Sequence, residues 1–181
     1  MNNHCTILGL PLQAGTGRGG CLMGPDAFRT AGLGDAILSQ GLGLTDLGNL
    51  SFPSKILDID GPKHLKKLSE IVAWTCDIQK QATVLSMAET LPIFIGGDHS
   101  MAAGTLSGVA LAAQTKDRPQ FVLWLDAHPD MNTLTSTTSG HLHGTPMAYA
   151  LGMQSFEGIF PPVLAPLDPA NVCMIGLRSV D

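Results

Sequence analysis

The stretch Leu123-Trp-Leu-Asp-Ala-His-Pro-Asp130 indicates both the fold and the site of this chain. An apolar run is followed by Asp126, His128 and Asp130, which stand at alternate positions. Near-continuous apolar character is typical of a strand that is covered on both faces, as in a parallel sheet. Alternate residues of an extended segment lie on one side, so the two carboxylates and the imidazole are expected to converge at the carboxyl end of this strand.

Further apolar runs bounded by Gly, Pro or Asp predict the other strands. The expected strands cover residues 7–10, 42–47, 93–95, 121–125 and 172–175. Helical spacing and helix-start residues predict helices between them, which open at residue 24 or cover about 63–89 and 100–113. Strands that alternate with helices imply an α/β fold with right-handed crossovers. The proline-rich stretch 156–169 is expected to be an irregular connection inside a single domain.

The histidines cluster in the middle of the chain. Four of the six lie between residues 99 and 143, and they flank the Asp126 motif. His99 follows an expected strand inside Gly96-Gly-Asp-His-Ser100, and two more histidines lie in Ser139-Gly-His-Leu-His-Gly144. Reactive residues of such folds collect at the carboxyl ends of strands, and this mixture of oxygen and nitrogen ligands suits Mn²⁺, Fe²⁺ or Zn²⁺. The plainer alternative for Asp126 is a helix-capping or loop aspartate with solvated neighbours.

Another motif, Gly15-Thr-Gly-Arg-Gly-Gly20, fits the G-x-G-x-x-G pattern of dinucleotide sites. Such a site requires a helix to begin at once, so that its amino end meets the pyrophosphate. The helix start is delayed here to Pro25. A flexible loop is therefore favoured over nucleotide binding.

The composition limits the classes of protein to which this chain can belong. The net charge is −5, and no basic cluster exceeds Lys66-Lys67, so no nucleic-acid partner is expected. No apolar run reaches the roughly 18 residues of a membrane span, and the first residues lack a secretion-signal pattern. The four cysteines show no C-x-x-C spacing. A cytoplasmic protein with reduced thiols is expected.

The motifs GGDHS at 96–100, DAHPD at 126–130 and TSTTSGHLHGTPMA at 135–148 resemble the successive signatures of the arginase/agmatinase ureohydrolases. The loop from Asn132 to His143 is similar to that of the arginine-cleaving branch. The resemblance implies a three-layer arginase-like α/β fold, with a parallel sheet flanked by helices. It also implies that residues 1–181 are one incomplete domain, which ends before the family's second acidic metal motif.

The resemblance implies a site for two Mn²⁺ ions. His99 is expected to bind one ion and His128 the other, while Asp126 bridges the two. Asp130 completes the shell of the first ion and belongs to the catalytic set.

The resemblance also implies roles in substrate binding and proton transfer. His143 matches a catalytic proton shuttle or general acid. Asn132 and Ser139 match residues that hold the carboxylate of the substrate, and Asp181 matches one that reaches its α-amino group through water. The implied reaction converts L-arginine, a small-molecule substrate, to L-ornithine and urea, as in the urea cycle, in a homo-oligomer (a trimer or hexamer).

Three residues depart from the pattern: Pro129, His141 in place of an asparagine, and Ser179 in place of an aspartate. An agmatinase or another guanidino-acid hydrolase is the alternative enzyme, and a catalytically inactive fragment is the alternative outside enzymes. In the implied fold, later strands insert between those expected at 93–95 and 121–125. A chain that ends at Asp181 is therefore expected to expose strand edges and not to form a stable monomer.

Overall fold

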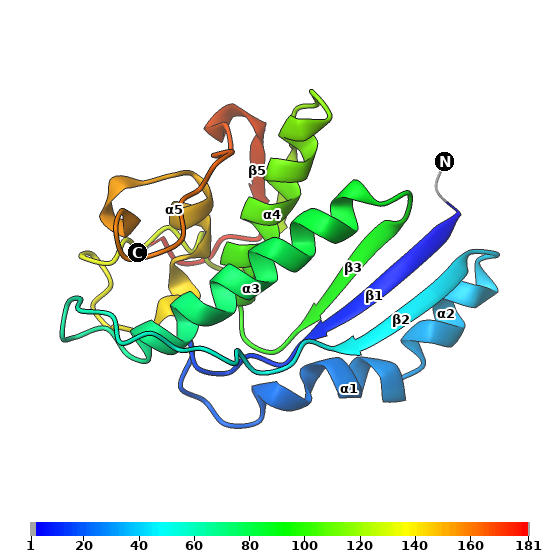
Figure 1. Cartoon of the computed structure of the whole chain (residues 1–181), viewed down its shortest axis with the longest axis horizontal. Coiled ribbons are helices and arrows are strands. Elements are labelled where there is room, and N and C mark those ends of the chain that lie inside the picture. Colours follow the sequence, from blue (N-terminus) through cyan, green and yellow to red (C-terminus); the bar gives the residue numbers. More distant parts are fainter. Residues whose placement is uncertain (1–2, 181) are drawn as a thin grey trace.

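The computed structural model describes residues 3–180 and contains two parallel sheets (Figure 1). The first has the strand order β2-β1-β3, with β1 at His4–Leu10, β2 at Gly43–Asn49 and β3 at Leu91–Gly96. The second pairs β4 (Val122–Leu125) with β5 (Val172–Ile175). Among the described residues the two sheets share no strand pairing. All five expected strands and the parallel α/β class are confirmed.

The helices fill the connections between strands. The α-helices are α1 (Gly24–Thr30), α2 (Leu33–Ser39), α3 (Leu68–Met87), α4 (Met101–Thr115) and α5 (Pro146–Ala150). The 3-10 turns are η1 (Cys21–Met23), η2 (Leu142–Gly144), η3 (Gln154–Phe156) and η4 (Pro169–Asn171). Within the described range, none of these helices has the length and apolar character needed to cross a bilayer.

Two differences from the expected helices have local causes. Helix α3 begins at Leu68 rather than near residue 63, because Lys67 takes a left-handed backbone conformation with φ of 56° directly before it. Helices α2 and α5 were not expected. Each has seven residues or fewer, which is too short for an apolar repeat to show in the sequence.

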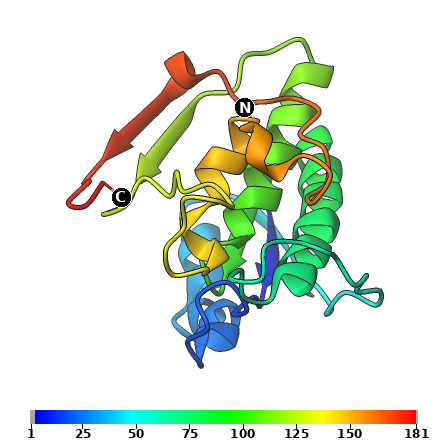
Figure 2. The same ribbon diagram turned by 90° about the vertical axis from the view of Figure 1, so that its left-hand side faces the viewer.

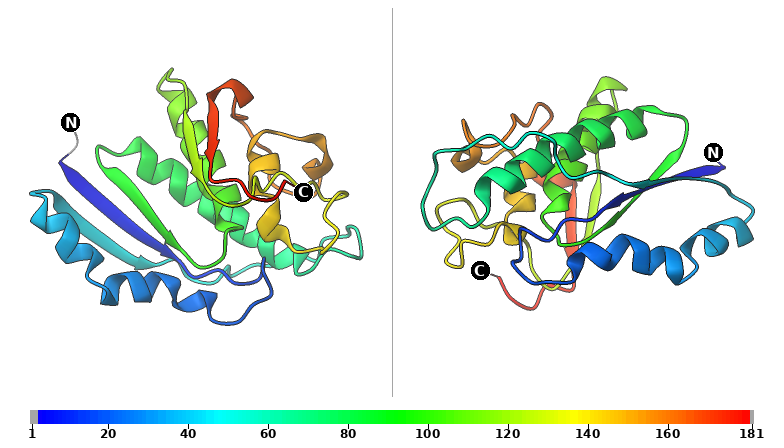
Figure 3. Two further views of the ribbon diagram at one scale, coloured as in Figure 1. Left: turned by 180° about the vertical axis from the view of Figure 1, so that it is seen from behind. Right: turned by 60° about the horizontal axis from the view of Figure 1, so that its bottom comes forward.

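Strand β1 is the centre of the first sheet and is buried on both faces. Ile7 packs with Ile37 of α2 on one face, whereas Leu8 and Leu10 pack with Trp74 of α3 on the other. Figure 3 shows α1 and α2 on one side of this sheet and α3 on the other. The alternation of side chains along one buried strand therefore gives the layered arrangement.

Helix α4 lies between α3 and the second sheet (Figure 2). Toward α3 it presents Gly104 and Gly108, where an added Cβ would lie 2.6 Å from the Ile78 Cβ and 2.5 Å from the Gln79 carbonyl oxygen. Toward the second sheet its alanines pack against Trp124. The small residues of this helix thus pack against a sheet through the alanines and against a second helix through the glycines.

The second sheet is covered on one face only within the described residues. Trp124 is buried, whereas the side chains of Leu123, Leu125 and Ile175 are 62%, 70% and 55% exposed. The continuous apolar run therefore does not give β4 two covered faces in this structure. Its outer face is an apolar surface of the kind that associates with another protein surface.

We predict that the 181-residue chain self-associates, because this apolar face and the unpaired edges of β3 and β4 are open to a neighbour. Size-exclusion chromatography with light scattering should give a mass above 19.0 kDa. The double change Leu123→Lys and Leu125→Lys should reduce the association, while Val84→Lys on α3, also at an exposed position, should not. A concentration-independent monomer would contradict the prediction.

We predict that Gly108→Ala destabilises the fold by about 1–3 kcal/mol, because its methyl group would overlap the Gln79 carbonyl. This cost should outweigh the ~1 kcal/mol that alanine gains over glycine inside a helix. Urea unfolding is the measurement. Gly19→Ala, where a Cβ meets nothing within 4 Å, is the control and should change stability little.

Candidate metal centre

The carboxyl ends of β3 and β4 meet although the two strands belong to different sheets. His99 lies in the turn between β3 and α4, and Asp126 directly follows β4. The Nδ1 of His99 is 3.0 Å from Asp126 Oδ2 and 2.7 Å from Asp130 Oδ2. The candidate ligand atoms of all three residues lie within 4.8 Å of one another. Three of the four expected metal ligands therefore form one cluster.

Asp130 is held in place by its backbone. Its φ is 50°, a left-handed value that is uncommon outside glycine, and its side chain is only 8% exposed. Its carbonyl oxygen accepts hydrogen bonds from the backbone N–H groups of Met147 and Ala148, at 3.0 and 3.4 Å. The unexpected helix α5 thus fixes the turn that points this carboxylate toward His99.

His128 lies beside the cluster rather than inside it. Its side chain is 54% exposed, and its Nδ1 is 3.7 Å from Asp126 Oδ1. Its backbone N–H donates to the same oxygen at 3.0 Å, and its carbonyl accepts from Trp124 Nε1 at 3.1 Å. The alternating pattern therefore brings the two carboxylates together, while the imidazole of His128 remains at the rim next to Asp126.

The environment of His99 favours its charged form. Burial lowers its pKa, but the hydrogen bond to Asp130 and the negative charges of Asp130, Asp126 and Asp98 raise it by more, so the pKa lies above its ordinary value. The ring also stacks on Trp124, with centroids 4.6 Å apart and an interplanar angle of 21°. The cluster therefore places an imidazole with a raised pKa between two carboxyl groups.

Asp98 is a site residue that the sequence analysis did not assign. It is buried, and it accepts hydrogen bonds from the backbone N–H groups of Gly15, Thr16 and Ser100 at 2.8, 3.1 and 2.9 Å, and from the Ser100 hydroxyl. The start of the glycine-rich loop is therefore tied to the residue before His99 instead of being free. The signal in the sequence was an aspartate two residues before a serine at a strand end, which is typical of a backbone-binding turn.

His143 binds the other side of the same loop. Its Nδ1 lies 3.1 Å from the carbonyl oxygen of Gly15, and its backbone N–H donates to that oxygen at 3.4 Å. A carbonyl oxygen only accepts, so Nδ1 carries a proton and Nε2 is the nitrogen that does not bind Gly15. Gly15 therefore links His143 to Asp98, which directly precedes the candidate ligand His99.

The remaining expected site residues lie on the loop before η2 or beyond the described range. The Asn132 backbone N–H donates to the Gly144 carbonyl at 3.1 Å. The hydroxyl of Ser139, an exposed residue, accepts from the His141 backbone N–H at 3.2 Å. Asp181 lies outside the described residues. The structure thus places Asn132 and Ser139 on the segment that leads to His143.

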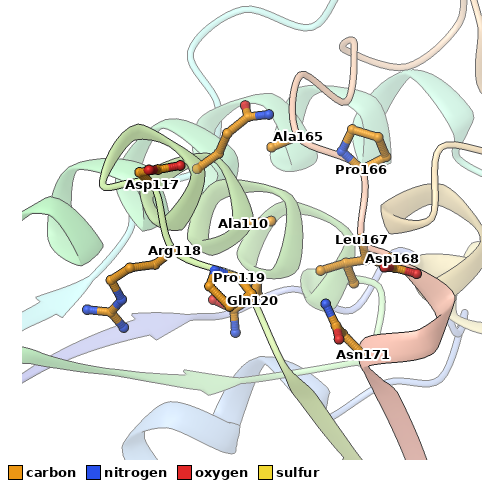
Figure 4. Close-up of a pocket in the computed structure, with 11 residues that line it drawn as sticks. Ala110, Asp117, Arg118, Pro119, Gln120, Ala165, Pro166, Leu167, Asp168 and Asn171 are labelled. Atoms are coloured by element: carbon orange, nitrogen blue, oxygen red, sulfur yellow. The ribbon is translucent and has the colours of Figure 1, made fainter.

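A separate cavity of about 340 Å³ lies at the amino ends of β4 and β5 (Figure 4). Arg118, Asp168 and Asn171 are among the residues that line it, but none of the candidate metal ligands does. Figure 4 shows Arg118 extending away from Asp168 and Asn171. Its charged groups do not converge, so this cavity is not the candidate centre.

Comparison with known proteins agrees with the motifs. A model of the Arginase family matches residues 3–181. The chain is 56% identical over 179 residues to the arginase of Brucella melitensis and 34% identical over 186 residues to that of Bacillus subtilis. These matches cover 98% and 100% of the chain but 58% and 60% of the relatives, so the chain spans about three fifths of their length.

Solved structures give the same result. The crystal structure of the arginase from Bacillus cereus matches with a TM-score of 0.81 at 30% identity, and that from Bacillus caldovelox with 0.80 at 33%. Each match covers 98% of this chain and 58% of the solved chain. The fold, the clustered motifs and the sequence identity agree, and the chain belongs to the arginase family.

Proposed function

We propose that this chain supplies part of the active site of a metal-dependent hydrolase that converts L-arginine to L-ornithine and urea. The observation that carries the proposal is the convergence of His99, Asp126 and Asp130 from the ends of two strands in separate sheets. The names of its relatives support the same activity. A small guanidino compound is the proposed substrate, and a cytoplasmic homo-oligomer is the proposed form of the enzyme.

The donor set fits the proposed pair of Mn²⁺ ions. One imidazole nitrogen and two carboxylates lie close together, and mixed nitrogen and oxygen ligands suit first-row divalent metals. We assign His99 and Asp130 to one ion, His128 to the other, and Asp126 to both. His128 already contacts Asp126, so the proposed bridging residue stands between the two histidines. When bound, paired divalent ions lower the pKa of water and supply a nucleophile at neutral pH.

Residues around the cluster are suited to proton transfer and to substrate binding. His143 donates through Nδ1 to the Gly15 carbonyl, so Nε2 is the nitrogen suited to carry a proton to or from the reacting groups. We assign Asn132 and Ser139 to the carboxylate of the substrate and Asp181 to its α-amino group.

The ordered loop before η2 favours arginine over agmatine, which lacks a carboxylate. The Thr133 backbone N–H donates to the Ser136 hydroxyl at 2.8 Å, and that hydroxyl donates to Asn132 Oδ1 at 2.9 Å. A preformed polar loop of this kind contributes affinity only to a substrate that has a polar end to bind.

We predict that the 181-residue chain binds at most one Mn²⁺, and weakly. Its four proposed ligands include two carboxylates, which compensate the mutual repulsion of two divalent ions poorly. Titration calorimetry with elemental analysis is the measurement. Asp126→Ala should abolish the binding, while Asp58→Ala in an exposed loop should not. Two tightly held ions per chain would contradict the prediction.

We predict that His143→Ala lowers turnover by about 100-fold while the metal content stays the same, because the residue moves protons and binds no metal. The test uses a chimera, in which residues 1–181 are followed by the part of the Brucella melitensis arginase beyond its match to them. His64→Ala, at an exposed histidine, is the control. A His143 variant that lost its manganese would show that the residue is a metal ligand.

A further inference from the structure

A lysine and a histidine meet at the rim of the candidate site. Lys66 Nζ lies 3.1 Å from Nε2 of His141, which joins the segment before α3 to the loop before η2. The backbones of these segments are also tied, since the Lys66 N–H donates to the Gly140 carbonyl at 2.9 Å. Gly140 is required there, because an added Cβ would lie 2.0 Å from the His64 carbonyl oxygen. The contact between the two side chains is therefore held by two packed backbones.

The positions of the hydrogen atoms between Lys66 and His141 follow from the chemistry of the two groups. A lysine ammonium only donates hydrogen bonds, so Nε2 of His141 is the acceptor and the ring proton is on Nδ1. That Nδ1 is buried and has no hydrogen-bond partner in the described structure. The ring packs against Gly17, where an added Cβ would lie 2.6 Å from its Cε1. His141 therefore holds Lys66 in place and has its own donor unused.

The charge of Lys66 is not compensated by a carboxylate. Its neighbour Lys67 lies 3.9 Å from Glu70, but no ion pair involves Lys66 within residues 3–180. A compact ammonium fixed by a histidine and facing no acid is suited to bind an anion from solution.

Lys66 lies on the same side of the molecule as the proposed proton carrier. The ring centroids of His141 and His143 are 6.0 Å apart. Gly15 and Gly17 of one loop contact these two rings, and Gly15 also donates to Asp98 next to His99. The loop from Gly15 to Gly17 thus contacts both Asp98, the residue before His99, and the His141 ring that holds Lys66.

We propose that Lys66, positioned by His141, binds the carboxylate end of the substrate and so selects guanidino acids over guanidino amines. The inference rests on the proposed function. The amino-acid end of arginine carries a carboxylate beside its α-ammonium, and the ammonium of Lys66, which forms no ion pair within residues 3–180, is a partner for that carboxylate. Lys66 is the residue that contacts the ligand, and His141 is a positioning residue.

The test compares the binding of ornithine and putrescine, which differ only in the carboxylate. Both are measured on the metal-loaded chimera, as competitive inhibitors and by calorimetry. Lys66→Gln should weaken ornithine about fivefold, the effect expected of a partly exposed charge pair, and leave putrescine unchanged. Lys66→Arg should largely restore the preference. His141→Asn should raise KM for arginine and leave kcat unchanged. Lys67→Gln, which removes the neighbouring lysine paired with Glu70, should change neither inhibitor.

Two failures are distinguishable. A metal-loaded chimera that binds ornithine more tightly than putrescine but does not hydrolyse arginine contradicts the proposed function and leaves the anion site standing. Equal effects of Lys66→Gln on the two inhibitors, or no effect on either, overturn the assignment of Lys66 even when arginine is hydrolysed. Ornithine that binds the unaltered chimera no more tightly than putrescine overturns it as well.

Discussion

The placement of two carboxylates beside one imidazole is the constraint on which the rest of the site depends. Asp126 and Asp130 repel each other when both are ionised, and the repulsion strengthens as water is excluded. His99 offsets it with a raised pKa and with contacts of 3.0 and 2.7 Å to the two acids. A divalent cation offsets the same repulsion with twice the charge. Two carboxylates and an imidazole this close together could therefore hold a divalent ion.

The cluster requires two strand ends to align without pairing to each other, and helix α4 achieves this. The helix begins at Met101, directly after His99 and Ser100, and its alanines pack on Trp124 of β4. Its opposite side approaches α3 closely through Gly104 and Gly108. The position of β4 relative to β3 therefore depends on how α4 packs against both β4 and α3. Substitutions at the interface of α4 with α3 are expected to change the position of His99 relative to Asp126.

The sequence predicted the strands and the clustering of His99 with Asp126 and Asp130 because both leave strong local signals. Apolar runs mark strands, and acids with histidines after such runs mark strand-end sites. It did not predict helix α5 or the left-handed turn at Asp130, although that turn orients the carboxylate, because a single backbone conformation leaves little trace in residue types. The exposed ring of His128 likewise depends on tertiary contacts. Asp98 was overlooked because its partners, Gly15 and Thr16, are far away in the sequence.

The loop after β1 connects the two charged sides of the site. Gly15 donates to Asp98 and accepts from His143, and Gly17 packs against the ring of His141. Glycine is needed at both places: a Cβ at residue 15 would lie 2.4 Å from the Ser100 hydroxyl oxygen, and Gly17 has φ of 64°. The motif that resembled a nucleotide loop therefore has another physical basis. Its glycines allow the backbone to pass between Asp98 on one side and the rings of His141 and His143 on the other.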